Sequence, residues 1–381
     1  MKRILIVAGE ASGDLHGANL VRSIQTKCRE DIYFEGIGGT RLASVGVRLV
    51  AQTHDLAVMG FQEIFPKAAS LYKIFMRMIR RMDSEPRPDL LILIDFPDFN
   101  LALARAAKKR GIKVFYYVSP QVWAWRRGRV RTIARLVDHL AVILPFEPAF
   151  YSRAGVPATF VGHPLLDALG EPPEKSTVTS TLGLDPSRPL VALLPGSRRG
   201  EVSLILPAML EAAAIMAKSQ PELQFVLPVA PTLDSRSIQD MVKKMSSVQV
   251  LVTTMQSFQV TAVSDVALVA SGTATLETAL AGCPLVVTYR VTKLNYLIGR
   301  SVIKVDFISL VNLVAGRKVV EELIQEQATP DRLAAEALTL LHDPIKRGRM
   351  LAGLTEVKTA LGQGGASNRA ADLVLSLLYG N

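Results

Sequence analysis

Cysteine is scarce in this chain, and no long apolar run is present. Two cysteines occur among 381 residues, Cys28 and Cys283, and neither belongs to a C-x-x-C or Cys/His cluster. This scarcity argues against a disulfide framework or a structural zinc site and is typical of a cytosolic protein. No apolar stretch approaches the ~20 residues needed to cross a bilayer. The composition, 49% hydrophobic and 20% charged, allows a large core.

Two motifs of nucleotide and sugar chemistry are also missing. The chain has no G-x-G-x-x-G, which argues against a dinucleotide-dependent oxidoreductase. It has no Asp-x-Asp, the pair that commonly holds a divalent cation in metal-dependent glycosyl transfer. A phosphorylated ligand would then have its charge neutralised by helix starts and arginine.

The net charge of +10 is confined to the first part of the chain. Residues 1–165 contain 24 Lys/Arg and 14 Asp/Glu, whereas residues 166–381 contain 20 of each. This asymmetry predicts that the first part meets an anionic surface or partner.

Short buried-type strands alternate with helical patterns along the whole chain, which predicts an α/β fold with parallel sheets. A polar, proline-bearing stretch at 170–176 reads as a linker. We therefore expect two doubly wound domains, 1–168 and 177–363, that face a cleft. A final helix at about 364–381 is expected to pack back on the first domain or on a partner subunit.

The expected strand 90–94 leads into a pair of carboxylates, Asp95 and Asp98. A carboxylate at the end of a buried strand can have a raised pKa and act as a general base. Asp95 leaves the strand first and is the preferred base, with Asp98 as its competitor. The alternative is that both carboxylates cap the following helix.

The first expected strand runs into a glycine-rich turn. Gly9 and Gly13 would let a ligand approach the start of a helix. Glu10 and Asp14 suit the hydroxyls of a sugar better than a phosphate. The alternative is an ordinary tight turn between a strand and a helix.

Residues 66–82 have the clearest amphipathic pattern in the chain. The apolar face includes Leu71, Ile74, Phe75 and Met78, and the basic residues include Arg77, Arg80 and Arg81. Periodicity favours a core-facing helix with a solvated basic side, whereas a sharper hypothesis places the helix in the plane of lipid headgroups. Both tryptophans, Trp123 and Trp125, lie beside Arg126 in a run without acidic residues, which suits a membrane interface, a sugar phosphate or single-stranded nucleic acid.

The second half contains two turns between a strand and a helix that suit an anion. Ser271, Gly272 and Thr273 precede a helix that carries Glu277, and Gly196, Ser197 and Arg198 precede another. Unpaired backbone N–H groups at such helix starts bind phosphate. The alternative for 271–273 is a simple cap by Ser or Thr. Asn312 lies in a further loop with polar residues in an apolar frame.

The chain resembles the lipid-A-disaccharide synthase family, glycosyltransferases of the GT-B architecture. The resemblance rests on the segments 7–14, 56–60, 94–100, 117–126, 160–164, 194–198 and 271–277. The run Ser119-Pro120-Gln121-Val122-Trp123-Ala124-Trp125-Arg126 is the most specific of them, while the glycine-rich and Ser-Gly-Thr parts are shared with other GT-B enzymes.

The resemblance implies an inverting transfer from UDP-2,3-diacylglucosamine to 2,3-diacylglucosamine 1-phosphate (lipid X), which gives the β(1→6)-linked disaccharide 1-phosphate and UDP in lipid A biosynthesis. By motif, Ser271, Gly272 and Thr273 would hold the diphosphate, Glu277 the ribose and Arg198 a phosphate. Asp95 would take the proton of the acceptor, and Glu10 and Asn312 would line the cleft. No cofactor or metal is implied.

The resemblance also implies a cytoplasmic protein bound peripherally to the inner membrane. Some members form homodimers by exchanging C-terminal segments. The competing functions are another UDP-sugar enzyme of the same fold, such as a UDP-N-acetylglucosamine 2-epimerase or a soluble sugar transferase, and, from other classes, an oxidoreductase or a non-enzymatic basic module that binds membrane or nucleic acid. The basic helix and the Trp/Arg run favour a lipid substrate over the other UDP-sugar enzymes of this fold.

Overall fold

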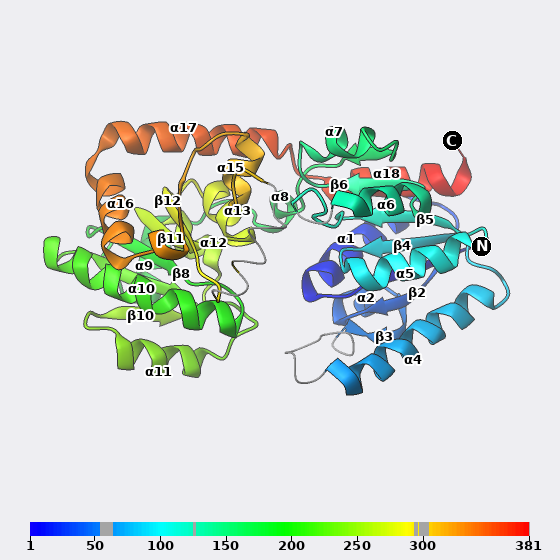
Figure 1. Ribbon diagram of the computed structural model, residues 1–381, viewed down its shortest axis with the longest axis horizontal. Helices are drawn as coiled ribbons and strands as arrows, with labels where there is room; N and C mark the ends of the chain where they lie inside the picture. The colour runs from blue at the N-terminus through cyan, green and yellow to red at the C-terminus, as the bar shows by residue number, and fades with distance from the viewer. Residues whose placement is uncertain (54–63, 125–126, 293–295, 297–304, 381) are drawn as a thin grey trace. The chain divides into compact units, whose positions relative to one another are not determined.

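A computed structural model describes residues 1–53, 64–124, 127–292, 296 and 305–380 (Figure 1). The chain folds as two compact units. The N-terminal unit comprises Met1–Asp167 and Gln363–Asn381, and the C-terminal unit comprises Ala168–Gly362. The polar stretch at 170–176 therefore lies within the C-terminal unit, just after the first crossing of the chain.

The N-terminal unit is built on a seven-stranded sheet in the order β3-β2-β1-β4-β5-β6-β7, in which every pair is parallel. Its strands are β1 (Lys2–Ala8), β2 (Ile32–Gly38), β3 (Arg48–Gln52), β4 (Leu90–Ile94), β5 (Lys113–Tyr117), β6 (His139–Val142) and β7 (Ala158–Phe160). The central strands β1 and β4 are buried almost throughout, as expected for a sheet covered on both faces.

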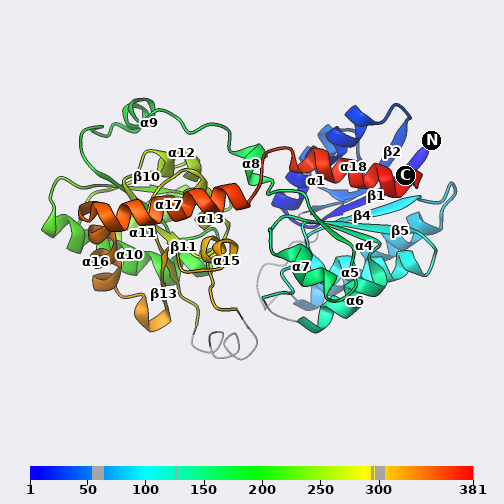
Figure 2. The same cartoon turned by 90° about the horizontal axis from the view of Figure 1, so that it is seen from above.

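Helices cover both faces of this sheet. They are α1 (Ala11–Lys27), α2 (Thr40–Ser44), α4 (Ile64–Asp83), α5 (Pro97–Lys108), η2 (Arg127–Arg129), α6 (Val130–Leu136), α7 (Glu147–Ser152), α8 (Leu165–Ala168) and α18 (Ala366–Tyr379). One apolar core gathers side chains of α4, α5 and α6, including Met78 and Ile133. The other gathers side chains of α1 and of the last helix, including Leu20 and Val374. Figure 2 shows α18 beside α1 on this second face.

The C-terminal unit contains a six-stranded parallel sheet in the order β10-β9-β8-β11-β12-β13. The strands are β8 (Leu190–Leu194), β9 (Gln224–Pro228), β10 (Val250–Thr253), β11 (Val266–Ala270), β12 (Leu285–Tyr289) and β13 (Glu321–Ile324). The helices are α9 (Lys175–Leu182), α10 (Arg199–Ser219), α11 (Ser235–Met245), α12 (Ser257–Ala262), α13 (Thr273–Leu280), α15 (Leu310–Ala315), η3 (Gln325–Gln327), α16 (Pro330–His342) and α17 (Pro344–Ala360). The predicted pair of parallel, doubly wound α/β domains is thus confirmed.

One helix in the described ranges, α10, is long and apolar enough to cross a membrane by length and composition. Half of the apolar stretch of α10 is buried inside the protein, and core helices of globular domains have the same length and composition. One such helix is weak evidence for a membrane span.

Candidate active site

The candidate residues gather at the point in each sheet where the strand order reverses. In the N-terminal sheet β1 and β4 are neighbours; Asp95 follows β4 directly, and Glu10 lies two residues after the end of β1. In the C-terminal sheet β8 and β11 are neighbours, and the segments 196–198 and 271–273 follow them. Crevices at the carboxyl ends of strands beside such a reversal are the usual ligand sites of open α/β sheets.

Asp95 stands in a strained turn at the end of β4. Its φ is 47° and that of Phe96 is 48°, so two consecutive non-glycine residues adopt the left-handed conformation. Each costs on the order of 1–2 kcal/mol, and such strain concentrates at functional sites. Burial, and then the negative charge of Glu10, raise the pKa of Asp95 to about 6, against the smaller opposing effect of a hydrogen bond from the Phe96 N–H. A carboxylate with this pKa is suited to accept a proton near neutral pH.

Glu10 is exposed and occupies the N-cap position of α1 without capping it. The preceding Gly9 leaves room for the ring of Phe96, because a Cβ at Gly9 would lie 2.2 Å from Phe96 Cγ. The loops that carry Glu10 and Asp95 are therefore packed together, and the two carboxylates interact electrostatically.

Asp98 has a different environment. It lies in the first turn of α5, its side chain is largely exposed, and it forms an ion pair with Arg129. The Arg129 guanidinium therefore occupies the Asp98 carboxylate as an acceptor. The geometry thus favours Asp95 over Asp98.

Gly13 and Asp14 lie at the beginning of α1 and make contacts within the N-terminal unit. Gly13 is buried in α1, where a Cβ would lie 3.5 Å from Ala8 Cβ and 3.6 Å from Ile94 Cγ2, so this position packs the helix on the sheet. The carboxylate of Asp14 accepts the backbone N–H groups of Gly39, Arg41 and Leu42 and holds the start of α2. The carboxylate of Asp14 thus has a structural role, and the contact of Gly13 with a ligand stays a prediction.

Trp123 is a core residue rather than a surface residue. Its side chain is 5% exposed, its ring lies edge-on to Phe146, and its indole N–H donates to Glu147 Oε1. Glu147 is buried and also accepts from the Ser119 hydroxyl and from backbone N–H groups. The expectation that Trp123 meets a membrane or acceptor is therefore corrected. Trp125, Arg126 and the motif at 56–60 lie outside the described residues.

The apolar side of α4 faces the protein core. Ile74 and Met78 are buried, and Leu71, Phe75 and Ile79 pack against the same cluster. The core-facing alternative is thus confirmed for Ile74 and Met78, which are buried, whereas Leu71 and Phe75 are partly exposed and their contact with headgroups stays a prediction.

The basic residues of α4 divide into two groups. Arg77 and Arg80 are exposed. Arg81 instead pairs with the fully buried Glu35, which also binds Arg3. Arg81 is therefore structural, whereas Arg77 and Arg80 remain available to an anionic surface.

Helices α13 and α10 are among the described helices of the C-terminal unit that begin without a side-chain cap. The N-cap of α13 is Gly272 and that of α10 is Arg198, and in neither helix does a first-turn N–H donate to the side chain of the N-cap residue. The expected alternative of a Ser or Thr cap at 271–273 does not apply, since Ser271 Oγ donates to the carbonyl of Ile308 at 3.0 Å. Uncapped starts keep N–H donors and partial positive charge available for phosphate.

The side chains around these starts suit a nucleotide. The side chain of Arg198 is 78% exposed. Its Nη1 lies 3.8 Å from Glu201 Oε1, which is long for an ion pair and leaves the guanidinium accessible. Gly196 has φ 116° and a Cβ there would lie 2.8 Å from Glu201 Oε2, so this turn requires glycine. Glu277 is partly buried on α13, and the hydroxyl of Ser257 orients it through a hydrogen bond to Oε2 at 2.6 Å.

Asn312 stabilises this site indirectly, through buried hydrogen bonds. It is fully buried, its Nδ2 donates to Val320 O and Glu322 Oε1, and its Oδ1 accepts from Val319 N and Val320 N. Glu322 in turn accepts the N–H groups of Ile308 and Ser309. The expected contact of Asn312 with substrate is thus corrected: Asn312 and Glu322 hold the peptide to which Ser271 bonds. No sequence motif singled out Glu322.

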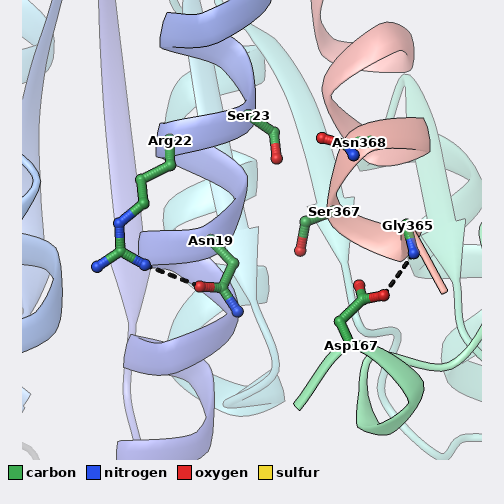
Figure 3. A pocket seen from close by; sticks show the side chains of 7 residues that line it. All are labelled: Asn19, Arg22, Ser23, Asp167, Gly365, Ser367 and Asn368. Carbon is green, nitrogen blue, oxygen red and sulfur yellow. Dashed lines mark hydrogen bonds between the residues drawn. The ribbon is translucent and has the colours of Figure 1, made fainter. Parts of the chain in front are cut away.

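A cavity of about 350 Å³ lies elsewhere in the N-terminal unit, between α1 and α18 (Figure 3). Mostly polar residues line it, and none of the candidate residues is among them. Arg22 donates to Asn19 at 3.0 Å, and Asp167 accepts the N–H groups of Gly365 and Ala366 at the start of α18. The cavity is separate from the strand ends that carry the candidate chemistry.

Comparisons with known proteins agree with the geometry. A family model described as lipid-A-disaccharide synthetase matches residues 4–374. The chain is 50% identical over 377 residues to a lipid-A-disaccharide synthase of Syntrophus aciditrophicus, covering 99% of this chain and 98% of that protein. It is 46% identical over 377 residues to the Geobacter metallireducens protein of the same name, covering 99% and 97%.

Solved structures resemble the chain in fold. A UDP-GlcNAc 2-epimerase from Neisseria meningitidis bound to UDP-GlcNAc has a TM-score of 0.67 at 14% identity, covering 98% of this chain and 100% of that one. The glycotransferase of kitacinnamycin has a TM-score of 0.64 at 17% identity, covering 99% and 98%. These identities show the GT-B-like fold alone and do not favour an epimerase.

Proposed function

The chain belongs to the lipid-A-disaccharide synthase family, and from this premise we propose that it condenses UDP-2,3-diacylglucosamine with 2,3-diacylglucosamine 1-phosphate. The products are the β(1→6)-linked disaccharide 1-phosphate and UDP, and the enzyme is a hexosyltransferase of lipid A biosynthesis. The observation that carries the proposal is the 50% identity to a synthase of this name across 99% of the chain.

Asp95 is the general base of this transfer. Its carboxylate accepts the proton of the acceptor 6-hydroxyl while O6 forms a bond to the anomeric carbon of the donor. The bond from that carbon to the diphosphate breaks in the same displacement, so the configuration inverts and UDP leaves. The raised pKa of Asp95, about 6, supports this role, because the base is ionised at neutral pH and still takes a proton readily. Glu10, the neighbouring carboxylate, tunes that pKa.

The diphosphate binds at the starts of α13 and α10. Backbone N–H groups near Gly272 and Thr273, together with Gly196 and Ser197, donate to its oxygens, and the exposed guanidinium of Arg198 pairs with a phosphate. Glu277 accepts hydrogen bonds from the ribose. The negative charge that develops on the leaving UDP is thereby stabilised by these groups, without a metal or cofactor.

Both sugar substrates are lipids, so the enzyme works at the cytoplasmic face of the inner membrane. The excess of ten positive charges in residues 1–165, with Arg77 and Arg80 exposed on α4, supports binding to anionic headgroups. The final helix α18 packs on the N-terminal unit of its own chain. A homodimer with exchanged C-terminal segments would form these same contacts between two copies.

The test is direct. Purified protein is incubated with UDP-diacylglucosamine and lipid X, and both UDP and the disaccharide are quantified. We expect equal amounts of the two products, and a loss of turnover of about 10² or more in Asp95→Asn. Asp98→Asn is the matched control and should retain most activity. Absence of both products from the wild type would contradict the function, whereas a severe Asp98→Asn and a mild Asp95→Asn would contradict the assignment of the base.

A further inference from the structure

Two fully buried side chains, those of Asn100 and Tyr116, donate hydrogen bonds to the backbone of Asp95. Asn100 Nδ2 donates to the carbonyl of Asp95 at 2.7 Å and to that of Ile94 at 3.2 Å. The hydroxyl of Tyr116 donates to the same Asp95 carbonyl. One strained carbonyl thus receives two side-chain donors, from α5 and from β5.

We propose that Asn100 and Tyr116 are positioning residues for glycosyl transfer, which fix the peptide between Asp95 and Phe96 and thereby aim the Asp95 carboxylate. This inference rests on the proposed function, in which Asp95 is the general base. Neither residue touches the reacting atoms; each acts through the backbone of Asp95.

The conformation of the turn explains why such support is needed. Asp95 and Phe96 are both left-handed, a conformation that non-glycine residues leave readily because the Cβ crowds the backbone. The Phe96 N–H of this same peptide bonds to the Asp95 carboxylate, so a rotation of the peptide would withdraw the donor that orients the carboxylate. Two donors on the carbonyl of this peptide oppose the rotation.

Two further contacts hold the turn formed by Asp95 and Phe96. The ring of Phe96 fills the space above Gly9, where any Cβ would collide with it. The N–H of Asp95 bonds to Tyr117 O at 3.3 Å, which ties the turn to the neighbouring strand β5. The turn is therefore fixed by β5, α5 and the loop after β1 together.

The test compares two tyrosines that lose the same atom. Tyr116→Phe removes a hydroxyl that donates to Asp95 O, and Tyr151→Phe removes one that donates to Pro120 O at 3.1 Å in the same unit. We expect Tyr116→Phe to lower kcat about ten- to hundred-fold with KM for both substrates within about two-fold, because a displaced base slows the chemical step. Tyr151→Phe should leave kcat within about two-fold of wild type. Asn100→Ala is the second variant and should show the same split between kcat and KM.

A double-mutant cycle separates positioning from general damage. In an Asp95→Asn background, Tyr116→Phe should cause no further loss, since no carboxylate remains to be positioned. Equal losses in the two tyrosine variants, or an additive loss in the double mutant, would overturn the inference while leaving the proposed function intact. Full activity of Asp95→Asn alone would overturn both the inference and the assignment of Asp95 as the base, whereas the transfer reaction itself is tested by the products of the wild type.

Discussion

Replacing Glu10 with Gln is expected to shift the acidic limb of the pH–rate profile to lower pH. Asp95 has a pKa of about 6, raised first by burial and second by the charge of Glu10. The base must be ionised to accept a proton, so wild-type kcat/KM should rise with pH through a midpoint near 6. At pH 5 about one tenth of the enzyme would carry the ionised base. An ordinary aspartate would be almost fully ionised there.

The size of the shift follows from the order of the two causes. Glu10→Gln removes the smaller cause and leaves burial, so the midpoint should fall by on the order of one unit or less and remain above the ordinary value for aspartate. A fall of one unit would raise the activity at pH 5 from about one tenth to about one half of the plateau.

The assay is UDP release with saturating and limiting acceptor between pH 4.5 and 8. The phosphate of the acceptor also titrates, with a second pKa near 6, and could produce a similar limb. That titration belongs to the substrate and would not respond to Glu10→Gln, so the variant distinguishes the two sources. An unchanged midpoint in Glu10→Gln would refute the argument that the pair of carboxylates sets the acidic limb.

Three further predictions concern stability and surface charge. Asp95→Asn should raise the free energy of unfolding at pH 7.5 by up to about 3 kcal/mol. Because folding raises the pKa of Asp95, ionisation of this carboxyl destabilises the folded state increasingly as the pH rises from about 4 to about 6. At pH 4 the variant and the wild type should therefore have the same melting temperature. Arg81→Gln should cost about 1–3 kcal/mol because it removes a partner of the buried Glu35, whereas Arg80→Gln should leave the melting temperature unchanged and weaken binding to anionic liposomes in sedimentation assays; equal melting temperatures would contradict the division between them. Trp123→Phe should lower the melting temperature without changing liposome binding, since its indole N–H serves the core.

The parallel sheets could be predicted from the sequence wherever a strand is buried on both faces. Continuous apolar runs such as Leu90–Ile94 and Val266–Ala270 are unambiguous, and the structure places strands there. The strands β2, β3 and β13 were not predicted. Strand β2 carries Gly36 and the buried Glu35, whose charge is paired by arginines far away in the sequence, and β13 begins with two glutamates.

The positions of Asp95 and of the 271–273 turn could be predicted because both follow buried strands directly. The supporting residues could not be predicted in the same way. Asn100 stands in the same motif as Asp95, but nothing in the sequence indicates that its amide turns back onto the Asp95 carbonyl. The role of Trp123 depends on Glu147, a residue 24 positions away whose burial only the fold reveals.

Burial alone does not make a carboxylate a base, and the described acids of the N-terminal unit show the difference. The Glu147 oxygens accept four hydrogen bonds, Asp14 accepts three backbone N–H groups, and Glu35 lies between Arg3 and Arg81. Those carboxylates are occupied as acceptors, so a substrate proton would have to displace an existing donor. Asp95 is held instead through its backbone, because Asn100 and Tyr116 donate hydrogen bonds to its carbonyl. Its carboxylate accepts a hydrogen bond from the Phe96 N–H, which stabilises the charged form. A side chain fixed through its own main chain keeps lone pairs available for the acceptor hydroxyl, and this property, together with the raised pKa, distinguishes the catalytic candidate from its structural neighbours.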